Sequence, residues 1–293
     1  MSTKNYCLQS PESTDNQKIT SDYLNPFRKS ETEIHHHCRA KFYPDINGNY
    51  SLAQIQKFST PKFKEKGWEP VTSSKSSVRA DERERGTPDG ADISRATRRA
   101  KITAFDYIMC NPDLNAFVTF TYSPQAVSDK SSYEECYARL AVRLSNRVQR
   151  CDLKYVMVPE HTKVGDIHFH AIMNDYALRM ERAFSPKSGR PLSHNGKPLF
   201  NITDWKYGFT SAELIPDSEG DRKAVAKYIF KYMGKQMGQK IGGRYVLCGG
   251  DLKRPIYQYG ESETEFLPDT GAVYTRSVEI DSAGLTYDEW SFI

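Results

Sequence analysis

Two histidines separated by one residue are the feature of this sequence best suited to chemistry. His168-Phe169-His170 lies inside the segment DIHFHAIM, whose β-branched and aromatic content predicts a strand. Because alternate residues of a strand project from one face, both imidazoles point the same way while Phe169 packs on the other side. Two neighbouring imidazoles favour a divalent metal, which needs a third ligand on the same face.

A carboxylate stands where that third ligand is needed. The segment KYVMVPE, residues 154–160, predicts a second strand, and only HTKVG separates it from the histidine strand, so we expect a hairpin. Glu160 shares a face with the histidines if it lies opposite His168, and a slip of one residue would turn it away. The sequence thus predicts a metal site of Glu160, His168 and His170, with His161 facing away. A histidine pair without a metal role is the alternative.

A second group of residues combines phenols with ammonium groups. In KYIFKYMGK, residues 227–235, helical spacing puts Tyr228 and Tyr232 one turn apart and places Lys231 and Lys235 on the same face. This pattern indicates a reactive face on a helix. The alternative is an amphipathic helix whose tyrosines and lysines lie at the boundary of the core.

Together the two groups predict phosphoryl transfer. A free tyrosine has a pKa of about 10, and we expect neighbouring ammonium groups to lower it by favouring the phenolate. A metal would polarise a phosphoryl oxygen. Attack of a tyrosine on a phosphodiester gives a covalent phosphotyrosine and a 3′-hydroxyl, and it conserves the bond energy needed to rejoin the strand. A second tyrosine allows a second attack that resolves the first intermediate.

The elements around these residues predict an α+β fold. Residues 115–122, NAFVTFTY, predict a strand, and Ser132 with Glu135 forms the capping box of a helix. A further strand is expected near 205–215 and a helix over 222–235. The order strand, helix, strand, strand, strand, helix is typical of an antiparallel sheet covered by helices.

The charge of the chain is small overall but unevenly distributed. Its 41 Lys and Arg exceed its 37 Asp and Glu by four, yet residues 221–244 hold seven bases and one acid, and residues 258–293 hold eight acids and one base. This indicates an anionic partner bound at the basic segment and excluded from the acidic one, although a solvated charged surface is the alternative. The candidate DNA contacts are Arg222, Lys223, Lys227 and Lys235.

Aromatic residues next to a lysine form a weaker candidate for contact with DNA. Trp205, Tyr207 and Phe209 flank Lys206, and such sets stack unpaired bases. Their alternate spacing equally suits a half-buried strand.

Composition excludes several classes of protein. No apolar run approaches the roughly 18 residues of a membrane span, and the polar start, MSTKNYCLQSPESTDNQ, is unlike a secretory signal. Six scattered cysteines without a CxxC pair indicate reduced thiols in a cytosol. The tract His35–Cys38 has zinc ligands but lacks a second ligand cluster, so a flexible polar segment is the favoured interpretation.

We expect three parts along the chain. Residues 1–93 form a polar, partly disordered region, residues 94–257 the catalytic domain, and residues 258–293 an acidic tail. Within the first part, residues 61–91 are too polar to offset the entropy of ordering and are expected to be mobile. The short piece Lys41–Tyr43 is a candidate for packing on the main domain.

The ordered set of motifs resembles the HUH superfamily of single-stranded DNA nickases, which is named for two histidines flanking a hydrophobic residue, here His168-Phe169-His170. FVTFTY resembles the first motif of that family, and Glu160 occupies the place of the acid that precedes the histidine pair in related rolling-circle initiators. YIFKYMGK resembles the two-tyrosine motif of initiators from small single-stranded DNA phages, the Microviridae. SRATRRAK and WKYGF are similar to the gokushovirus branch, and the likeness covers about residues 94–257.

This resemblance implies an RRM- or ferredoxin-like antiparallel sheet with the histidine motif on a central strand. It implies an enzyme of the bacterial host cytoplasm that uses Mg²⁺ or Mn²⁺ and nicks the viral strand at the origin of replicative-form DNA. Tyr228 and Tyr232 would be its nucleophiles, with Lys231 beside them, and it would rejoin single-stranded DNA in rolling-circle replication.

The implied partners are DNA and a helicase of the host. No Walker A pattern occurs in the chain, so no helicase is fused to it, and no membrane is involved. A plasmid initiator or mobilisation relaxase is one alternative. A sequence-specific DNA-binding protein without catalysis, built on the same sheet, is another.

Overall fold

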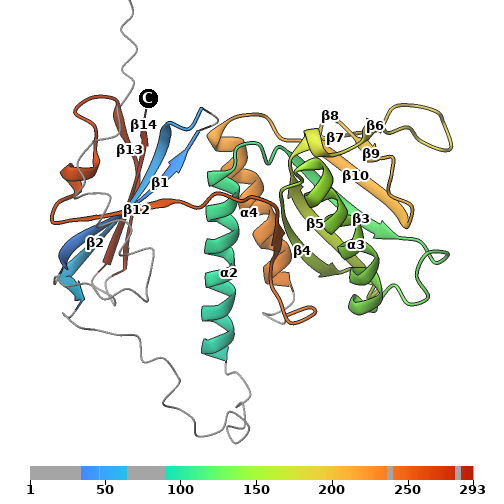
Figure 1. The fold of residues 1–293 in the computed structure, drawn as a ribbon, viewed down its shortest axis with the longest axis horizontal. Coiled ribbons are helices and arrows are strands. Elements are labelled where there is room, and N and C mark those ends of the chain that lie inside the picture. Colours follow the sequence, from blue (N-terminus) through green and yellow to red (C-terminus); the bar gives the residue numbers. More distant parts are fainter. Residues whose placement is uncertain (1–33, 46, 65–89, 236–239, 281–284, 293) are drawn as a thin grey trace, which may run out of the picture. The chain divides into compact units, whose positions relative to one another are not determined.

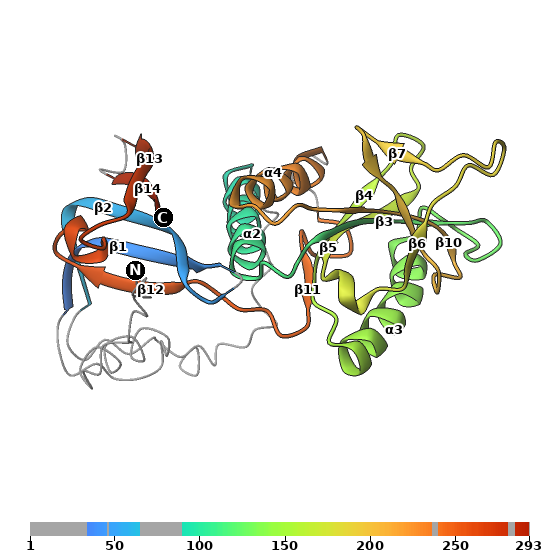
Figure 2. The ribbon, with the colours of Figure 1, turned by 90° about the horizontal axis from the view of Figure 1, so that it is seen from above.

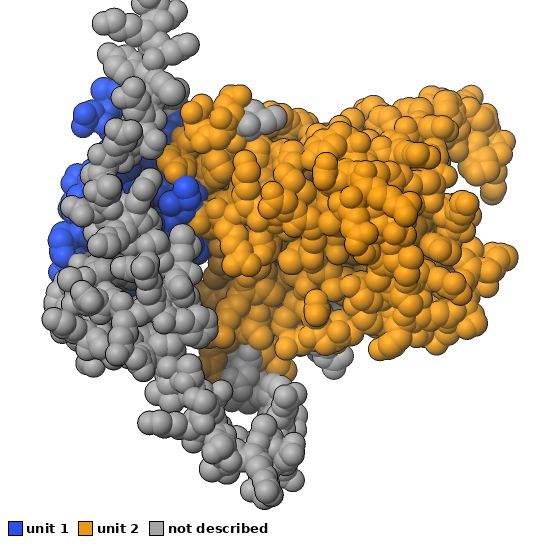
Figure 3. Space-filling view, viewed as in Figure 1, with its two compact units in different colours: residues 1–42, 52–86, 256–293 blue, residues 43–51, 87–255 orange. Residues whose placement is uncertain are grey.

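The computed structural model describes residues 34–45, 47–64, 90–235, 240–280 and 285–292. The chain divides into two units (Figure 3): unit 1 draws on residues 1–42, 52–86 and 256–293, and unit 2 on residues 43–51 and 87–255. Across the described ranges, no helix has the length and apolar character needed to cross a membrane.

Unit 1 is built on a five-stranded sheet in the order β12-β1-β2-β14-β13 (Figure 1). The strands are β1 (Ile34–Pro44), β2 (Tyr50–Lys64), β12 (Ile256–Gly260), β13 (Ala272–Ile280) and β14 (Leu285–Phe292), with the 3₁₀ helix η3 (Glu263–Phe266) between β12 and β13. Its core holds Phe42, Ile55 and Phe266, against which Trp290 packs.

The expectation of an acidic tail over residues 258–293 is wrong, because this segment is folded into the sheet of unit 1. Its charges are accommodated by pairing. Asp288 is buried on β14 beside the ammonium group of Lys57, which also lies 3.0 Å from a carboxylate oxygen of Glu263. The indole of Trp290 donates a hydrogen bond of 2.6 Å to Glu263. A sheet that buries one face tolerates polar residues at every other position, so an acidic composition does not exclude strands.

Unit 2 is built on a seven-stranded antiparallel sheet in the order β11-β4-β5-β3-β10-β9-β6. Its strands are β3 (Ala116–Tyr122), β4 (Tyr155–His161), β5 (Ile167–Met173), β6 (Met180–Arg182), β9 (Phe200–Ile202), β10 (Gly208–Leu214) and β11 (Leu247–Gly249). A small hairpin of β7 (Ser193–His194) and β8 (Lys197–Pro198) and the 3₁₀ helix η2 (Asp175–Ala177) complete it. This confirms the predicted α+β class with antiparallel sheets.

Helices cover both faces of this sheet (Figures 1 and 2). Helix α3 (Tyr133–Cys151) lies on one face, and helices α2 (Gly90–Cys110) and α4 (Glu219–Lys235) lie on the other. The α3 side contains Phe120 and Phe169, while the α4 side contains Val158, Ile172 and Ile229. Successive residues of β5 therefore enter different cores, as strand alternation requires.

Helix α3 begins as predicted at Ser132, but its cap differs from the predicted capping box. The Ser132 hydroxyl accepts a hydrogen bond of 3.3 Å from the backbone N–H of Glu135. The Glu135 carboxylate does not return to Ser132; it accepts hydrogen bonds from the backbone N–H groups of Ser128 and Asp129. Glu135 therefore orders the loop that leads into the helix.

The basic segment SRATRRAK lies within α2, whose 21 residues extend it well beyond a single turn. Tyr43 packs edge-to-face on Phe105 of α2 with ring centroids 5.8 Å apart, and its hydroxyl donates a hydrogen bond of 2.7 Å to Asp106. This contact confirms the expected packing of residues near Tyr43 on the main domain. Of the segment expected to be mobile, residues 65–89 lie outside the described part of the chain.

Candidate active site

The two histidines and the predicted carboxylate share one face of the sheet. The strands β4 and β5 form the predicted hairpin, and Glu160 pairs with His168, as the sequence predicted. His170 pairs with Val158 on one side and with Thr119 of β3 on the other. All three side chains therefore lie on the side of the sheet that α4 covers.

His170 is held by two hydrogen bonds. Its Nε2 lies 2.7 Å from Glu160 Oε2, and its Nδ1 lies 3.1 Å from the hydroxyl oxygen of Thr119. Because an ionised carboxylate only accepts, Nε2 carries a proton. In the neutral ring, the Thr119 hydroxyl then donates to Nδ1. His170 and Glu160 are each 6% exposed, so this pair lies largely out of water.

His168 is more open and is kept neutral. Burial lowers its pKa, an effect that the Lys130 ammonium group reinforces and that the Glu160 and Asp166 carboxylates oppose. A neutral imidazole is the form that binds metals. His161, by contrast, is exposed and bonds the Gly165 carbonyl at 2.8 Å, away from the site as expected.

The donor set suits a divalent metal, although its members are not gathered around one point. Imidazole nitrogens and carboxylate oxygens together bind first-row divalent ions. In this structure Glu160 is bonded to His170, and the rings of His168 and His170 have centroids 6.3 Å apart. Among the residues described, no three His, Cys, Asp or Glu side chains are arranged to hold a metal ion. Metal binding at Glu160, His168 and His170 therefore stays a prediction that requires these side chains to turn.

Tyr228 and Tyr232 both lie on the sheet-facing side of α4, but in different surroundings. The ring of Tyr232 stacks on His170, with centroids 3.8 Å apart and planes 13° from parallel, and this residue is 6% exposed. Tyr228 is 44% exposed and meets Tyr232 and Phe117 edge-on at 5.2 and 5.4 Å. One phenol is thus open to a substrate and the other is packed against the imidazole.

The expectation that ammonium groups lower the pKa of the tyrosines is wrong for Tyr232. Its pKa lies well above the ordinary value because burial disfavours the phenolate, and hydrogen bonding with Tyr228 and the nearby Glu160 carboxylate act in the same direction. The lysine nearest to the pair, Lys231, has its ammonium nitrogen 5.8 Å from the ring centroid of Tyr228. The sequence could not show that Tyr232 is buried among aromatic rings.

The four predicted DNA contacts occupy different environments. Lys227 is exposed on α4, whereas the side chain of Lys235 lies outside the described part. Arg222 is 6% exposed and its guanidinium lies 2.7 Å from the Asp217 carboxylate. Lys223 pairs with Glu219 at 2.7 Å within the first turns of α4. Contact with DNA through these residues stays a prediction, with Lys227 the best placed.

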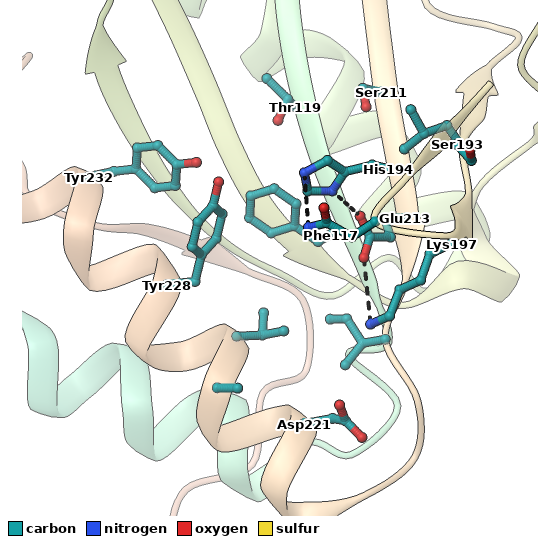
Figure 4. A pocket seen from close by; sticks show the side chains of 15 residues that line it. Phe117, Thr119, Ser193, His194, Lys197, Ser211, Glu213, Asp221, Tyr228 and Tyr232 are labelled. Atoms are coloured by element: carbon teal, nitrogen blue, oxygen red, sulfur yellow. Dashed lines mark hydrogen bonds and ion pairs between the residues drawn. The ribbon is translucent and has the colours of Figure 1, made fainter.

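A cleft of about 640 Å³ opens beside the tyrosines. Figure 4 shows Tyr228 and Tyr232 projecting from α4 on one side and His194, Lys197 and Glu213 on the facing side. Glu213 Oε2 lies 3.0 Å from His194 Nδ1, and Oε1 lies 3.6 Å from Lys197 Nζ. The sequence analysis missed this trio.

A tight-turn signal could have found the hairpin that carries His194 and Lys197, because Asn195 and Gly196 join its strands with φ of 49° and 78°. Nothing in the sequence shows that this hairpin folds back toward β10.

A row of side chains runs across the sheet from Glu160. Register pairs Glu160 with His168, His168 with Thr121, and Thr121 with Phe209 of β10. Phe209 is 73% exposed, although it lies on a strand inside the sheet. Gly208 permits this start of β10, because a Cβ there would lie 2.2 Å from the Thr121 carbonyl oxygen.

The other two aromatic candidates for base stacking lie on the α3 side of the sheet. Trp205 is buried in the core and Tyr207 is half-buried against it. Of the three, Phe209 is the ring that the structure leaves open to a base.

Comparison with known proteins adds one finding. Searches of curated proteins and of solved structures gave no match. Residues 115–237 match a family model of replication-associated proteins, the ORF2 type. The matched segment contains Glu160, both histidines and both tyrosines, so the residues of this site fall inside it. The match supports placing this segment of the chain with the replication-associated proteins, in a family of rolling-circle replication initiators.

Proposed function

We propose that this protein is a replication initiator that nicks the viral-strand origin, forms a 5′-phosphotyrosine link to DNA and rejoins single-stranded DNA in rolling-circle replication. The carrying observation is the stack of Tyr232 on His170 at 3.8 Å, beside the exposed Tyr228. It joins the tyrosine helix and the histidine strand into one site that borders a cleft. The family match to replication-associated proteins supports the same class of function.

The proposed reaction is a transesterification. The hydroxyl oxygen of a tyrosine attacks the phosphorus of a DNA phosphodiester, the new oxygen–phosphorus bond forms, and the bond to the 3′ oxygen breaks. The phenol loses its proton and the departing 3′ oxygen gains one. A later attack by a 3′-hydroxyl on the phosphotyrosine reverses these changes, so a strand is rejoined without ATP.

We infer that Tyr228 acts first and Tyr232 second. Tyr228 is 44% exposed, so its hydroxyl can meet a phosphodiester without rearrangement of the helix. Tyr232 must leave its stack on His170 and form a phenolate that its surroundings disfavour. Binding of the first DNA product is a source of the energy for that change.

Glu160, His168 and His170 are the residues we propose to hold a divalent cation, Mg²⁺ or Mn²⁺. When bound, such an ion polarises a phosphoryl oxygen and stabilises charge in the transition state. Thr119 keeps the ring of His170 oriented through its hydrogen bond at 3.1 Å.

The fine assignment rests on the resemblance. We propose that the sheet of unit 2 is of the RRM-like HUH kind and that the source is a phage similar to the gokushoviruses. The enzyme would act in the cytoplasm of the bacterial host, on the origin of replicative-form DNA and on single-stranded DNA, with a helicase of the host.

A single experiment tests this function. An oligonucleotide that carries the origin is incubated with the protein and Mn²⁺, and mass spectrometry searches for a peptide with a nucleotide remnant. The expected result is a remnant on the peptide that carries Tyr228. Absence of any covalent adduct, with binding intact, would instead support a DNA-binding protein in which the histidine and tyrosine stack is structural.

Replacing Lys231 with Met should slow nicking more than it weakens binding. The ammonium group lies near the Tyr228 ring, where it favours the developing phenolate charge. We expect cleavage to fall by about tenfold, as loss of one favourable charge at an exposed site implies, with the dissociation constant for DNA nearly unchanged. Lys227→Met on the same helix is the matched control, and equal losses in binding and cleavage would make Lys231 an ordinary phosphate contact.

Phe209→Ala should weaken the binding of single-stranded DNA by about tenfold, because one base stacked on an aromatic ring is worth roughly 1–3 kcal/mol. Phe209 lies two strands from His168, about 10 Å at the spacing of a sheet. A base stacked there belongs to a nucleotide close to the cleaved bond. Fluorescence anisotropy with a labelled oligonucleotide measures the effect.

Two further variants control the Phe209 experiment. Phe209→Tyr keeps the ring and should keep the affinity. Phe184, 53% exposed in the loop after β6, is an exposed phenylalanine away from this face, so Phe184→Ala should leave binding unchanged. A loss of affinity in Phe184→Ala equal to that in Phe209→Ala would contradict a specific base contact.

A further inference from the structure

The outer side of α3 carries a stripe of arginines. Arg139, Arg143, Arg147 and Arg150 follow one another at spacings of four, four and three residues, which places them on one face of the helix. At 1.5 Å per residue the stripe runs for about 16 Å. None of the chemistry proposed for the tyrosines uses it, because α3 and α4 cover opposite faces of the sheet (Figure 2).

This stripe borders a groove of about 380 Å³. Five of the lining side chains are cationic and one is anionic: Arg143, Arg147, Arg150, Arg179 and Lys206, with Asp204. The groove therefore has a strong positive excess on a surface for which the nicking reaction offers no role.

Asp204 fixes two of these arginines and leaves the others open. Arg143 donates to the Asp204 carboxylate at 2.5 Å and to its backbone carbonyl at 2.7 Å, and Arg147 donates to the second carboxylate oxygen. These bonds hold the guanidinium groups in place along the groove. Arg150 and Arg179 are exposed.

We propose that this groove, defined by Arg143, Arg147, Arg150, Arg179 and Lys206, binds the phosphate backbone of duplex DNA on the side of the sheet opposite the tyrosines. The choice of DNA rests on the proposed function, and the rest of the argument rests on charge and shape. A stripe of about 16 Å spans roughly five base-pair steps of a B-form duplex at 3.4 Å each.

The groove suits a duplex backbone better than unpaired bases. Proteins that bind single strands place open aromatic rings beside their cations. The aromatic ring that lines this groove, Tyr207, is half-buried, and the guanidinium carbon of Arg139 lies 6.0 Å from its centroid. Arginines without an open ring beside them contact phosphates and read no sequence.

Such a site would hold the uncut duplex while the single strand occupies the cleft beside Tyr228. The two sites lie on opposite faces of one sheet, so both can be filled together. The groove thus accounts for how an enzyme that cuts single strands could stay attached to replicative-form DNA.

The test compares two double variants of the full chain that lose the same charge. Arg150→Ala/Arg179→Ala removes exposed cations from the groove, and Lys187→Ala/Arg190→Ala removes two from the exposed loop between β6 and β7. The probes are a labelled DNA duplex of random sequence and a short single-stranded origin oligonucleotide, each titrated at several salt concentrations.

For the groove variant we expect duplex binding about tenfold weaker at low salt and a salt slope smaller by up to about 1.8, since each phosphate contact contributes about 0.9. Its binding and cleavage of the short single strand should match the parent. Arg150→Lys/Arg179→Lys keeps the charge and should restore the slope. The loop variant should bind duplex like the parent.

Two results would overturn the groove assignment: an unchanged duplex slope in Arg150→Ala/Arg179→Ala, or an equal loss in the loop variant. Equal losses for duplex and for the short single strand would place the groove on the path of the cleaved strand, against the proposal. A parent that cleaves no DNA would refute the proposed function alone, because the duplex titration decides the groove separately.

Discussion

Tyr228→Phe is expected to form no covalent adduct with origin DNA in the first cleavage, whereas Tyr232→Phe is expected to form the adduct and fail to resolve it. Removing a covalent nucleophile lowers the rate by about 10⁴-fold or more, because no other group performs the same step. Phenylalanine keeps the ring and its contacts, so the packing of Phe117 and His170 against α4 survives the change.

The difference between the two tyrosines follows from their surroundings. Tyr228 presents its hydroxyl to the cleft, while Tyr232 is stacked on His170 and its pKa is raised by burial. Denaturing gels with a labelled oligonucleotide measure adduct formation, and a second oligonucleotide with a 3′-hydroxyl measures rejoining.

Tyr176→Phe provides the matched control for this experiment. Tyr176 is 62% exposed and its hydroxyl lies 3.4 Å from the Asp113 carboxylate, away from the cleft residues. It should cleave and rejoin like the parent. The reverse order, with Tyr232→Phe unable to form the first adduct, would contradict the assignment of Tyr228 as first nucleophile. Cleavage by the double variant Tyr228→Phe/Tyr232→Phe would contradict tyrosine chemistry altogether.

The histidine face was predictable because a strand has a period of two. That period alone puts His168 and His170 on one side, and the five residues between the two strands are few enough to force a hairpin. The sequence could not give the bond that forms across it. Glu160 is level with His168 but bonds His170, a choice that depends on side-chain torsions and on the Tyr232 ring above.

Burial was the main property of the site that the sequence could not supply. Helical spacing places Tyr228 and Tyr232 one turn apart, but it does not show how far α4 leans onto the sheet. The lean buries Tyr232 and leaves Tyr228 open, which reverses the expected effect on the pKa of Tyr232. Arg222 was misjudged in the same way, since a basic residue in a basic segment is expected at the surface and this one is buried beside Asp217.

Unit 1 was missed because its sheet is assembled from distant segments. Strands β2 and β14 pair residues more than 200 positions apart, for example Phe58 with Leu285. Neither segment has enough apolar residues to indicate a core alone, and each buries only one face. Local composition therefore predicts a polar arm and an acidic tail, where long-range pairing produces a sheet.

His168→Ala is expected to lower cleavage by about 10³-fold or more while leaving most of the DNA affinity. A metal contributes several kcal/mol to the transition state, equal to that loss of rate, and contacts to phosphates carry the binding. His168 is only partly buried, so its removal should cost little stability. Cleavage assays, anisotropy and thermal unfolding on the same preparations give the three readouts.

His170→Ala should differ in one respect, and the difference separates a catalytic role from a structural one. It removes the partner of the buried Glu160 carboxylate at 2.7 Å and the ring on which Tyr232 stacks. An unpaired buried acceptor costs roughly 1–3 kcal/mol, so this variant should be less stable as well as inactive.

Glu160→Gln completes the comparison, because the amide can still pair with His170 but is a poor metal ligand. We expect near-normal stability, lost cleavage and weaker binding of Mn²⁺ in calorimetric titration. If Glu160→Gln and His168→Ala both fold, bind Mn²⁺ like the parent and still cleave, then the Glu160–His170 pair serves packing alone. The metal would then have to be sought away from this face of the sheet.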